Sequence, residues 1–252
     1  MIYIERIAPP ERFEKETEAW MQAWKTKHTQ KSASQFWRLI RQRKRMKLFA
    51  KQLIAMFHEK CAYCESKSGH VAHLHIEHFY PKSYIEFQHL IFVWENWLVA
   101  CQICNQNKGT QFPMCDDVPC LVNPTEDSPH EHVDFIGADI LAITKRGKET
   151  INIIDLNRTM LKEERSRWLM NIKSLLILIC RESELKQEIR KYLIWAMQPD
   201  APYSAMTKAY LLEKTPKLAK PTTPHSHAEL DKPLDKIDAL LEEMKVILNT
   251  IA

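Results

Sequence analysis

Four cysteines stand in two pairs of identical spacing, and they are the clearest chemical signal in the chain. Cys61 and Cys64 form the first pair, and Cys101 and Cys104 form the second. Two intervening residues let both thiolates of a pair reach one ion from a tight turn, and four such sulfurs complete a tetrahedral Zn²⁺ shell at about 2.3 Å each. We therefore predict a structural zinc site, because four protein sulfurs leave no open coordination position.

A second group of polar residues lies between and beside the cysteine pairs. Glu77 and His78 are consecutive and are soon followed by a proline and a lysine, a pattern that predicts the end of a strand and the start of a loop. Asn96 stands shortly before the second cysteine pair. That pair is expected to begin a short helix, which carries Asn105 in its first residues and Lys108 one turn later.

These residues, in this order and with this placement of the cysteine pairs, resemble the HNH endonucleases, which are ββα-metal nucleases. The surrounding sequence is similar to that of the HNH proteins of retrons and of the Septu anti-phage system, the PtuB-like group. The segments that carry this resemblance are CAYCE, HIEHFYPKS, WENWLVACQICNQNKGTQFP, LVNPTEDSPHEHVDF and ETINIIDLNRTML. The resemblance covers residues 55–165, and the rest of the chain after them carries no motif that we can assign.

The resemblance implies a role for each polar residue. His78 is the general base that takes a proton from the attacking water, Asn96 orients the loop and His78, and Glu77 with Asn105 holds one catalytic divalent cation. Glu77 stands where the family often has Asp or His, and Asn105 where it often has His. Both supply oxygen ligands, which suit Mg²⁺ or Mn²⁺. A neutral histidine can accept a proton from water near pH 7, although a histidine taken alone is more often a structural hydrogen-bonding residue.

The densest basic run of the chain lies at residues 38–47, within a segment with helical periodicity. Such a run is either a solvated helix face or a strip that contacts phosphates. For Lys108 the alternative is likewise a lysine that faces solvent. The phosphate-binding candidates are Arg41, Arg45, Lys82 and Lys108.

The composition is that of an ordinary globular protein, with 252 residues of which 45% are apolar and 27% charged. The net charge of +4 is too small to prove a polyanionic partner. No apolar stretch approaches the ~20 residues of a membrane span, and no signal sequence is visible, so we expect a bacterial cytoplasmic protein with reduced thiols. A second metal site is disfavoured, because the gap between its two cysteines is loose; its ligands would be Cys115, Cys120, His130 and His132.

We predict an α+β fold that is predominantly helical, with a zinc-clamped ββα-metal nuclease core and flanking helices. Only 4 residues are glycine, which predicts few left-handed turns. Periodicity predicts helices at 11–28, 34–59, 159–180 and 184–197, and short strands at 133–136, 140–144 and 150–154. The expected parts are an N-terminal helical region at 1–59, the nuclease core at 60–113, a short β element with helices at 114–213, a proline-rich linker at 214–226 and a heptad helix at 227–252.

The leading hypothesis is a metal-dependent HNH nuclease that cuts phosphodiester bonds of nucleic acid, with DNA as the default because of the family. The resemblance implies an effector of a bacterial defence system that works with an ATPase partner, PtuA-like, in a homo- or hetero-oligomer. The helix at 227–252 either packs on its own domain or docks a partner. Two alternatives remain: a nuclease that works alone, as a restriction-type enzyme, and a zinc-ribbon adaptor that binds nucleic acid without catalysis.

Overall fold

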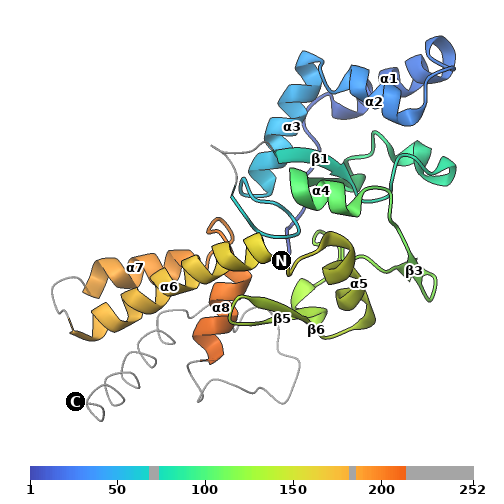
Figure 1. Ribbon diagram of the computed structural model, residues 1–252. Coiled ribbons are helices and arrows are strands. Elements are labelled where there is room, and N and C mark those ends of the chain that lie inside the picture. Colours follow the sequence, from blue (N-terminus) through green and yellow to red (C-terminus); the bar gives the residue numbers. More distant parts are fainter. Residues whose placement is uncertain (68–73, 182–185, 214–252) are drawn as a thin grey trace. The chain divides into compact units, whose positions relative to one another are not determined.

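The computed structural model of the chain describes residues 1–67, 74–181 and 186–213 (Figure 1). They form two compact units. Of the described residues, the first unit contains those within 1–133 and 142–156, and the second contains those within 134–141 and 157–213. The expected boundaries after residues 59 and 113 both lie inside the first unit. The predicted linker at 214–226 and helix at 227–252 lie outside the described residues.

The first unit contains a ββα arrangement. Strand β1 (Leu74–His78) pairs antiparallel with β2 (Trp97–Cys101), in the register that places His78 opposite Trp97. Two short 3₁₀ helices, η1 (Ile85–Leu90) and η2 (Trp94–Asn96), lie in the connection between the strands. Helix α4 (Gln102–Lys108) follows β2 directly and packs against both strands. The predicted α+β class and its ββα core are confirmed.

Three N-terminal helices precede this core, where two were predicted. They are α1 (Phe13–Lys27), α2 (Ala33–Ile40) and α3 (Lys44–Met56). The prediction of one helix over 34–59 is wrong, because the chain turns at residues 41–43. The turn divides the basic run, with Arg38 in α2, Arg41 and Arg43 in the connection, and Lys44, Arg45 and Lys47 in α3.

Aromatic side chains connect the N-terminal helices to the strands. Phe13 of α1 makes edge contacts with Phe49 of α3, Trp94 and Trp97, at ring-centroid separations of 5.1, 5.2 and 5.1 Å. Edge-to-face pairs of this kind are worth about 0.5–1.5 kcal/mol beyond the area they bury. The N-terminal helices therefore share one core with β2 and hold that strand in place.

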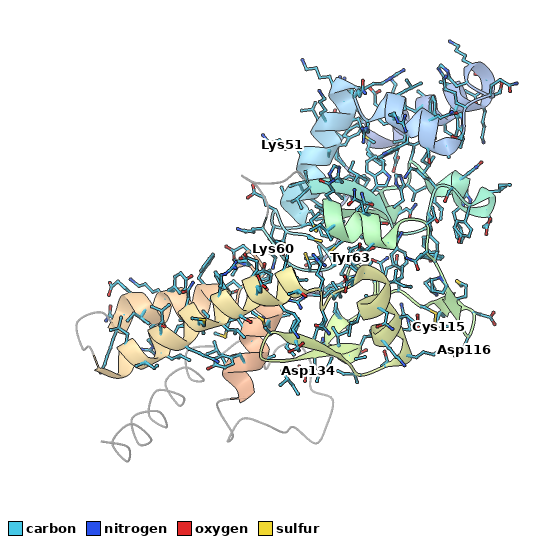
Figure 2. The ribbon with its side chains drawn as sticks, in the orientation of Figure 1. Lys51, Lys60, Tyr63, Cys115, Asp116 and Asp134 are labelled. Atoms are coloured by element: carbon cyan, nitrogen blue, oxygen red, sulfur yellow. A yellow bond between two sulfur atoms is a disulfide. The ribbon has the colours of Figure 1, made fainter. Side chains whose placement is uncertain are left out.

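The chain after α4 departs from the prediction at the cysteines. Strands β3 (Met114–Cys115) and β4 (Val118–Pro119) form a short hairpin, and Cys115 and Cys120 are joined by a disulfide (Figure 2). The expectation of reduced thiols is thus wrong for this pair. Because both sulfurs are used in the disulfide, they do not form a metal site with His130 and His132.

The predicted strand at 150–154 is instead the second half of helix α5 (Lys145–Ile154). The helix begins at Thr144, whose hydroxyl accepts a hydrogen bond from the backbone N–H of Gly147. Gly147 also permits a close approach, because a Cβ atom there would lie 1.9 Å from the carbonyl oxygen of His132. A short β-branched run cannot by itself distinguish strand from helix, and here the cap decided for helix.

The second unit is helical apart from a hairpin. Strands β5 (Val133–Ile136) and β6 (Asp139–Ala142) surround Gly137, whose φ of +58° suits a glycine, so the two strands were predicted close to their observed places. Helices α6 (Thr159–Arg181) and α7 (Lys186–Ala196) match the predicted helices, whereas α8 (Ser204–Glu213) was not predicted. The core of these helices contains Ile172, Leu176, Ile189, Leu193, Ala196 and Leu211. No described helix is both long enough and apolar enough to cross a membrane.

Candidate functional site

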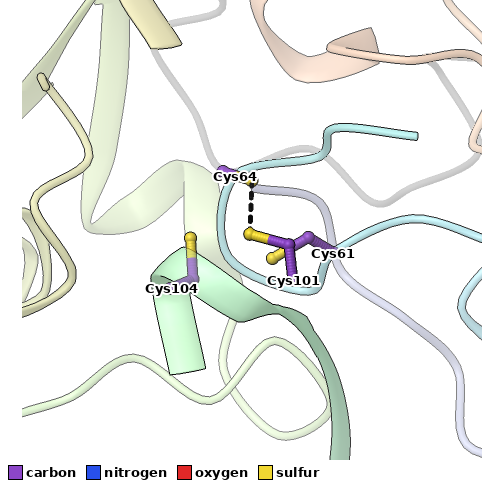
Figure 3. Close-up of side chains that lie close together, drawn as sticks. All are labelled: Cys61, Cys64, Cys101 and Cys104. Carbon is purple, nitrogen blue, oxygen red and sulfur yellow. Dashed lines mark hydrogen bonds between the residues drawn. The ribbon is translucent and has the colours of Figure 1, made fainter. Parts of the chain in front are cut away.

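The four cysteines predicted to bind zinc converge in the first unit (Figure 3). Cys61 and Cys64 lie in the turn after α3, Cys101 ends β2, and Cys104 lies in α4. All four are buried, and their sulfur atoms lie within 4.8 Å of one another. The Sγ atoms of Cys64 and Cys101 are 3.9 Å apart, close to the roughly 3.8 Å between sulfurs that share a tetrahedral Zn²⁺. The cluster therefore has the donors and the spacing for a metal ion.

The pKa values of these thiols are shifted in opposite directions by their shared, buried surroundings. Hydrogen bonds with the neighbouring thiols hold the pKa of Cys64 well below its ordinary value, and lower that of Cys101. Burial raises the pKa of Cys61 well above its ordinary value, and hydrogen bonds with the other cysteines raise that of Cys104. Four thiolates in so small a buried space require a compensating positive charge, which a divalent metal supplies.

The first cysteine turn also positions the polar residues of β1. The backbone N–H of Ala62 donates to the carbonyl of Val99 at 2.7 Å, which fixes the turn on β2. Tyr63, in the same turn, is completely buried, and its hydroxyl donates to a carboxylate oxygen of Glu77 at 3.0 Å. The metal cluster and the acidic residue of β1 are therefore linked through one turn of chain.

Glu77 forms a buried ion pair with Lys108 of α4. The Nζ atom of Lys108 lies 2.5 Å from Oε1 of Glu77, and the two side chains are 1% and 3% exposed. Lys108 also donates to the backbone carbonyl of His78 at 2.9 Å. Lys108 is thus neither a lysine that faces solvent nor one that faces the pocket described below, and we revise its role from phosphate candidate to the charge partner of Glu77.

His78 is buried and has two different ring nitrogens. Nε2 lies 3.0 Å from the carbonyl oxygen of Ile91, an arrangement in which Nε2 carries the proton and donates it. Nδ1 has no hydrogen-bond partner within the part of the chain that the structure describes. Trp37 of α2 contacts the imidazole edge to face, with ring centroids 4.4 Å apart.

The surroundings keep the His78 ring neutral. Burial holds the pKa of His78 well below its ordinary value, and the nearby charge of Lys82 lowers it further, while the hydrogen bond with Ile91 acts in the opposite direction. A neutral imidazole whose Nε2 donates to a carbonyl presents a lone pair at Nδ1. This is the state that a proton acceptor requires.

Asn96 connects the strands to the loop between them. Its Oδ1 accepts from the N–H of Tyr80 at 2.7 Å, and its Nδ2 donates to the carbonyls of Tyr80 at 3.2 Å and Leu90 at 3.1 Å. Its backbone carbonyl accepts from the N–H of Phe79, the residue after His78, at 3.0 Å. Asn96 therefore acts on the course of the loop, and it is absent from the walls of the pocket described next.

A pocket of about 520 Å³ brings the remaining site residues together. Glu77 and His78 line it from β1, and Asn105 lines it from α4. Helices α2 and α3 form the opposite side, with Trp37, Arg38, Arg41, Met46 and Lys47 among the lining residues. The pocket thus places a proton acceptor, a carboxylate and an amide on one side and several cations on the other.

The predicted phosphate candidates separate in the structure. Arg41 and Lys82 line the pocket, whereas Arg45 lies 3.6 Å from Glu16 of α1 and is not part of the wall. Arg38 and Lys47 line the pocket but were not singled out from the basic run. The helical spacing of Arg38 from Arg41 and of Lys47 from Ala50 was visible in the sequence, yet which helix face would meet the strands was not.

Comparison with known proteins agrees with this geometry. Residues 61–111 match the HNH endonuclease family. The chain is 28% identical over 203 residues to the Septu protein PtuB of Bacillus mycoides, a match that covers 60% of this chain and 69% of that protein. It is 31% identical over 107 residues to the Septu protein PtuB of Bacillus thuringiensis, covering 42% of this chain and 40% of that protein. A third relative, the Septu protein PtuA of Bacillus mycoides, is 25% identical over 192 residues, which cover 66% of this chain and 27% of that protein.

Proposed function

We propose that the chain is an HNH nuclease similar to the Septu protein PtuB, and that it hydrolyses phosphodiester bonds with His78 as general base and a cation held by Glu77 and Asn105. The observation that carries the proposal is the free Nδ1 of a neutral, buried histidine on the wall of a pocket with cationic side chains opposite. Phosphodiester hydrolysis needs a base for water, charge neutralisation at the phosphate and help for the leaving oxygen.

His78 accepts the proton of the attacking water at Nδ1. The Ile91 carbonyl fixes the tautomer through Nε2, and it also favours the imidazolium that forms when Nδ1 takes the proton. Trp37 packs against the ring and limits its rotation. Asn96 acts as a positioning residue, because its three side-chain hydrogen bonds hold the loop that carries Tyr80 and the Leu90 carbonyl next to Ile91.

Glu77 and Asn105 are the residues that would hold the catalytic cation. One carboxylate and one amide oxygen fit a hard ion such as Mg²⁺ or Mn²⁺, which keeps several water ligands. Each Glu77 oxygen already accepts one hydrogen bond or ion-pair contact, from Tyr63 or Lys108, and each keeps a second lone pair. When bound, the cation supplies Lewis-acid stabilisation of the phosphate and of the leaving oxygen.

Zn²⁺ at the four cysteines is the structural counterpart in this proposal. The ion would join the turn after α3 to the β2–α4 junction, and so fix Tyr63 and α4 on either side of Glu77. A shell of four sulfurs has no open position, so the cluster itself takes no part in hydrolysis.

The substrate and partner follow from the relatives. We propose that the protein cuts DNA and acts as the effector nuclease of a Septu-type anti-phage system, together with a PtuA-like ATPase. The two PtuB relatives support the effector role, and the match to a PtuA protein supports the partnership. A zinc-ribbon adaptor is not favoured, because binding alone needs no proton acceptor beside a carboxylate.

The test is cleavage of plasmid DNA and of total RNA by the purified protein, with Mg²⁺, Mn²⁺ or no added cation, alone and with the co-encoded ATPase. Metal-dependent cutting that is lost in His78→Ala supports the assignment, provided that the variant keeps its zinc and its near-ultraviolet circular dichroism. Cutting that persists in His78→Ala contradicts it. Deleting residues 227–252 tests whether that segment docks the ATPase, and unchanged co-purification would refute docking.

A further inference from the structure

The wall of the pocket opposite β1 is formed by residues outside the segment that matches the HNH family. Ser34, Trp37, Arg38 and Arg41 follow one another at helical spacing, so they form one stripe along α2 and the turn after it. Lys47 adds a further cation from α3. The capping box between Ser32 and Gln35 fixes the start of α2, and its buried Phe36 and Ile40 hold the opposite face in the core.

Among the residues that the structure describes, the cations of this wall have no acidic partners. Within the described part of the chain, no carboxylate lies within ion-pair distance of Arg38, Arg41 or Lys47, although Arg45 on the same helices has Glu16. Lys82 lies across the same pocket. Burial lowers the pKa of Lys82, and the positive charges of Lys108 and Arg41 lower it further. The negative charge of Glu77 acts in the opposite direction. Unpaired positive charges around a concave site repel one another, and a bound anion offsets this repulsion.

We propose that Arg38, Arg41 and Lys47 bind backbone phosphates of the nucleic-acid strand beside the scissile bond, and we call these three residues the α2–α3 phosphate wall. This inference rests on the proposed nuclease function and extends it to the N-terminal helices. The same stripe carries Trp37, which contacts His78. Helix α2 with its C-cap residue Arg41 therefore contributes two of the three proposed phosphate contacts and also the packing of the proton acceptor.

The wall predicts binding without base specificity. Guanidinium and ammonium groups that contact phosphates contribute affinity and register but read no bases. Each phosphate contact releases counterions, so the logarithm of the affinity falls linearly with the logarithm of the salt concentration. We call the steepness of this line the salt slope, and each contact adds about 0.9 to it for B-form DNA. Three contacts therefore account for a slope of about 2.7.

The experiment compares two triple variants of the full chain that lose the same charge. Arg38→Gln/Arg41→Gln/Lys47→Gln removes the wall, and Lys15→Gln/Lys25→Gln/Lys27→Gln removes three exposed cations of α1 that do not line the pocket. Binding to a short fluorescein-labelled DNA duplex is followed by fluorescence anisotropy over a range of NaCl concentrations, without added divalent cation. A thermal melt of each variant establishes that it is folded.

We expect the wall variant to lose about 2–3 units of the salt slope and the α1 variant to lose less than about one. Equal slopes for the two variants would overturn the inference, as would a wild type that binds no DNA. If the wild type also cuts no nucleic acid with its partner present, the proposed function fails as well. If the wild type cuts nucleic acid normally but the two variants have equal salt slopes, the proposed nuclease function stands. Only the phosphate-binding role of the α2–α3 phosphate wall is then rejected.

Discussion

Replacement of Lys108 with methionine separates the two roles that can be assigned to this lysine. Its ammonium is the buried charge partner of Glu77 and also donates to the carbonyl of His78. Methionine keeps most of the apolar stem but leaves Glu77 with only the Tyr63 hydroxyl in a site where its side chain is 3% exposed. Loss of one member of a buried ion pair costs about 3–5 kcal/mol, so we expect the free energy of unfolding to fall by that amount.

The measurement is a urea titration and a thermal melt of the zinc-loaded protein. For a unit of this size, 3–5 kcal/mol corresponds to a Tm that is lower by about 10 °C. The second variant is Glu77→Gln/Lys108→Met, which removes the stranded charge. We expect its loss in free energy of unfolding to be at least about 2 kcal/mol smaller than the sum of the losses in Glu77→Gln and in Lys108→Met. Lys51→Met, an exposed change on α3, is the control and should stay within about 0.5 kcal/mol of the wild type.

A different result would refute the ion-pair role of Lys108. If Lys108→Met is as stable as Lys51→Met and instead lowers the salt slope of DNA binding by about one unit, Lys108 is a phosphate ligand and the ion-pair reasoning is refuted.

Four further predictions concern the site. The cutting rate should hold its plateau below pH 6.5, the ordinary pKa of histidine, because His78 protonates only when the pH falls through its lowered pKa; a pH–rate profile that is half-maximal at pH 6.5 or above would contradict this. For the same reason the unfolded chain binds more protons below pH 6.5, so His78 should make the protein less stable to urea as the pH falls further, and His78→Gln should weaken that dependence. Asn96→Ala removes three hydrogen bonds and should cost about 2–4 kcal/mol in urea, whereas a loss below about 1 kcal/mol would show that the loop holds itself. Cys104→Ser should abolish zinc binding, measured by atomic absorption, and unfold the ββα region; a stable variant with a full equivalent of zinc would refute the cluster.

Residue spacing predicted the cysteine cluster, and the resemblance to HNH endonucleases predicted the ββα core. The Cys-x-x-Cys pairs constrain both cysteines of a pair to one turn, and an intrachain metal shell then requires the two turns to meet. The pattern around Glu77 and His78 likewise predicted the end of a strand, and β1 ends at His78. These signals are local, so they do not depend on how the helices pack.

The sequence was less informative wherever a local pattern allowed two structures. The basic run reads as one helix, but it forms two helices, α2 and α3, which pack on the strands. The segment at 150–154 alternates like a strand, but the cap at Thr144 and the close approach of Gly147 to His132 made it helical. In both places a contact with a distant part of the chain decided between them.

The charges at the site show the same division. From sequence, Lys108, Lys82, Arg41 and Arg45 are equivalent cations near a nuclease motif. Only the fold turns Lys108 inward to Glu77, pairs Arg45 with Glu16 and leaves Arg41 and Lys82 facing the pocket. Residue types and spacings thus determined which chemistry the chain carries. The tertiary structure determined which charges line the pocket, because burial and ion pairing depend on segments that meet only after folding.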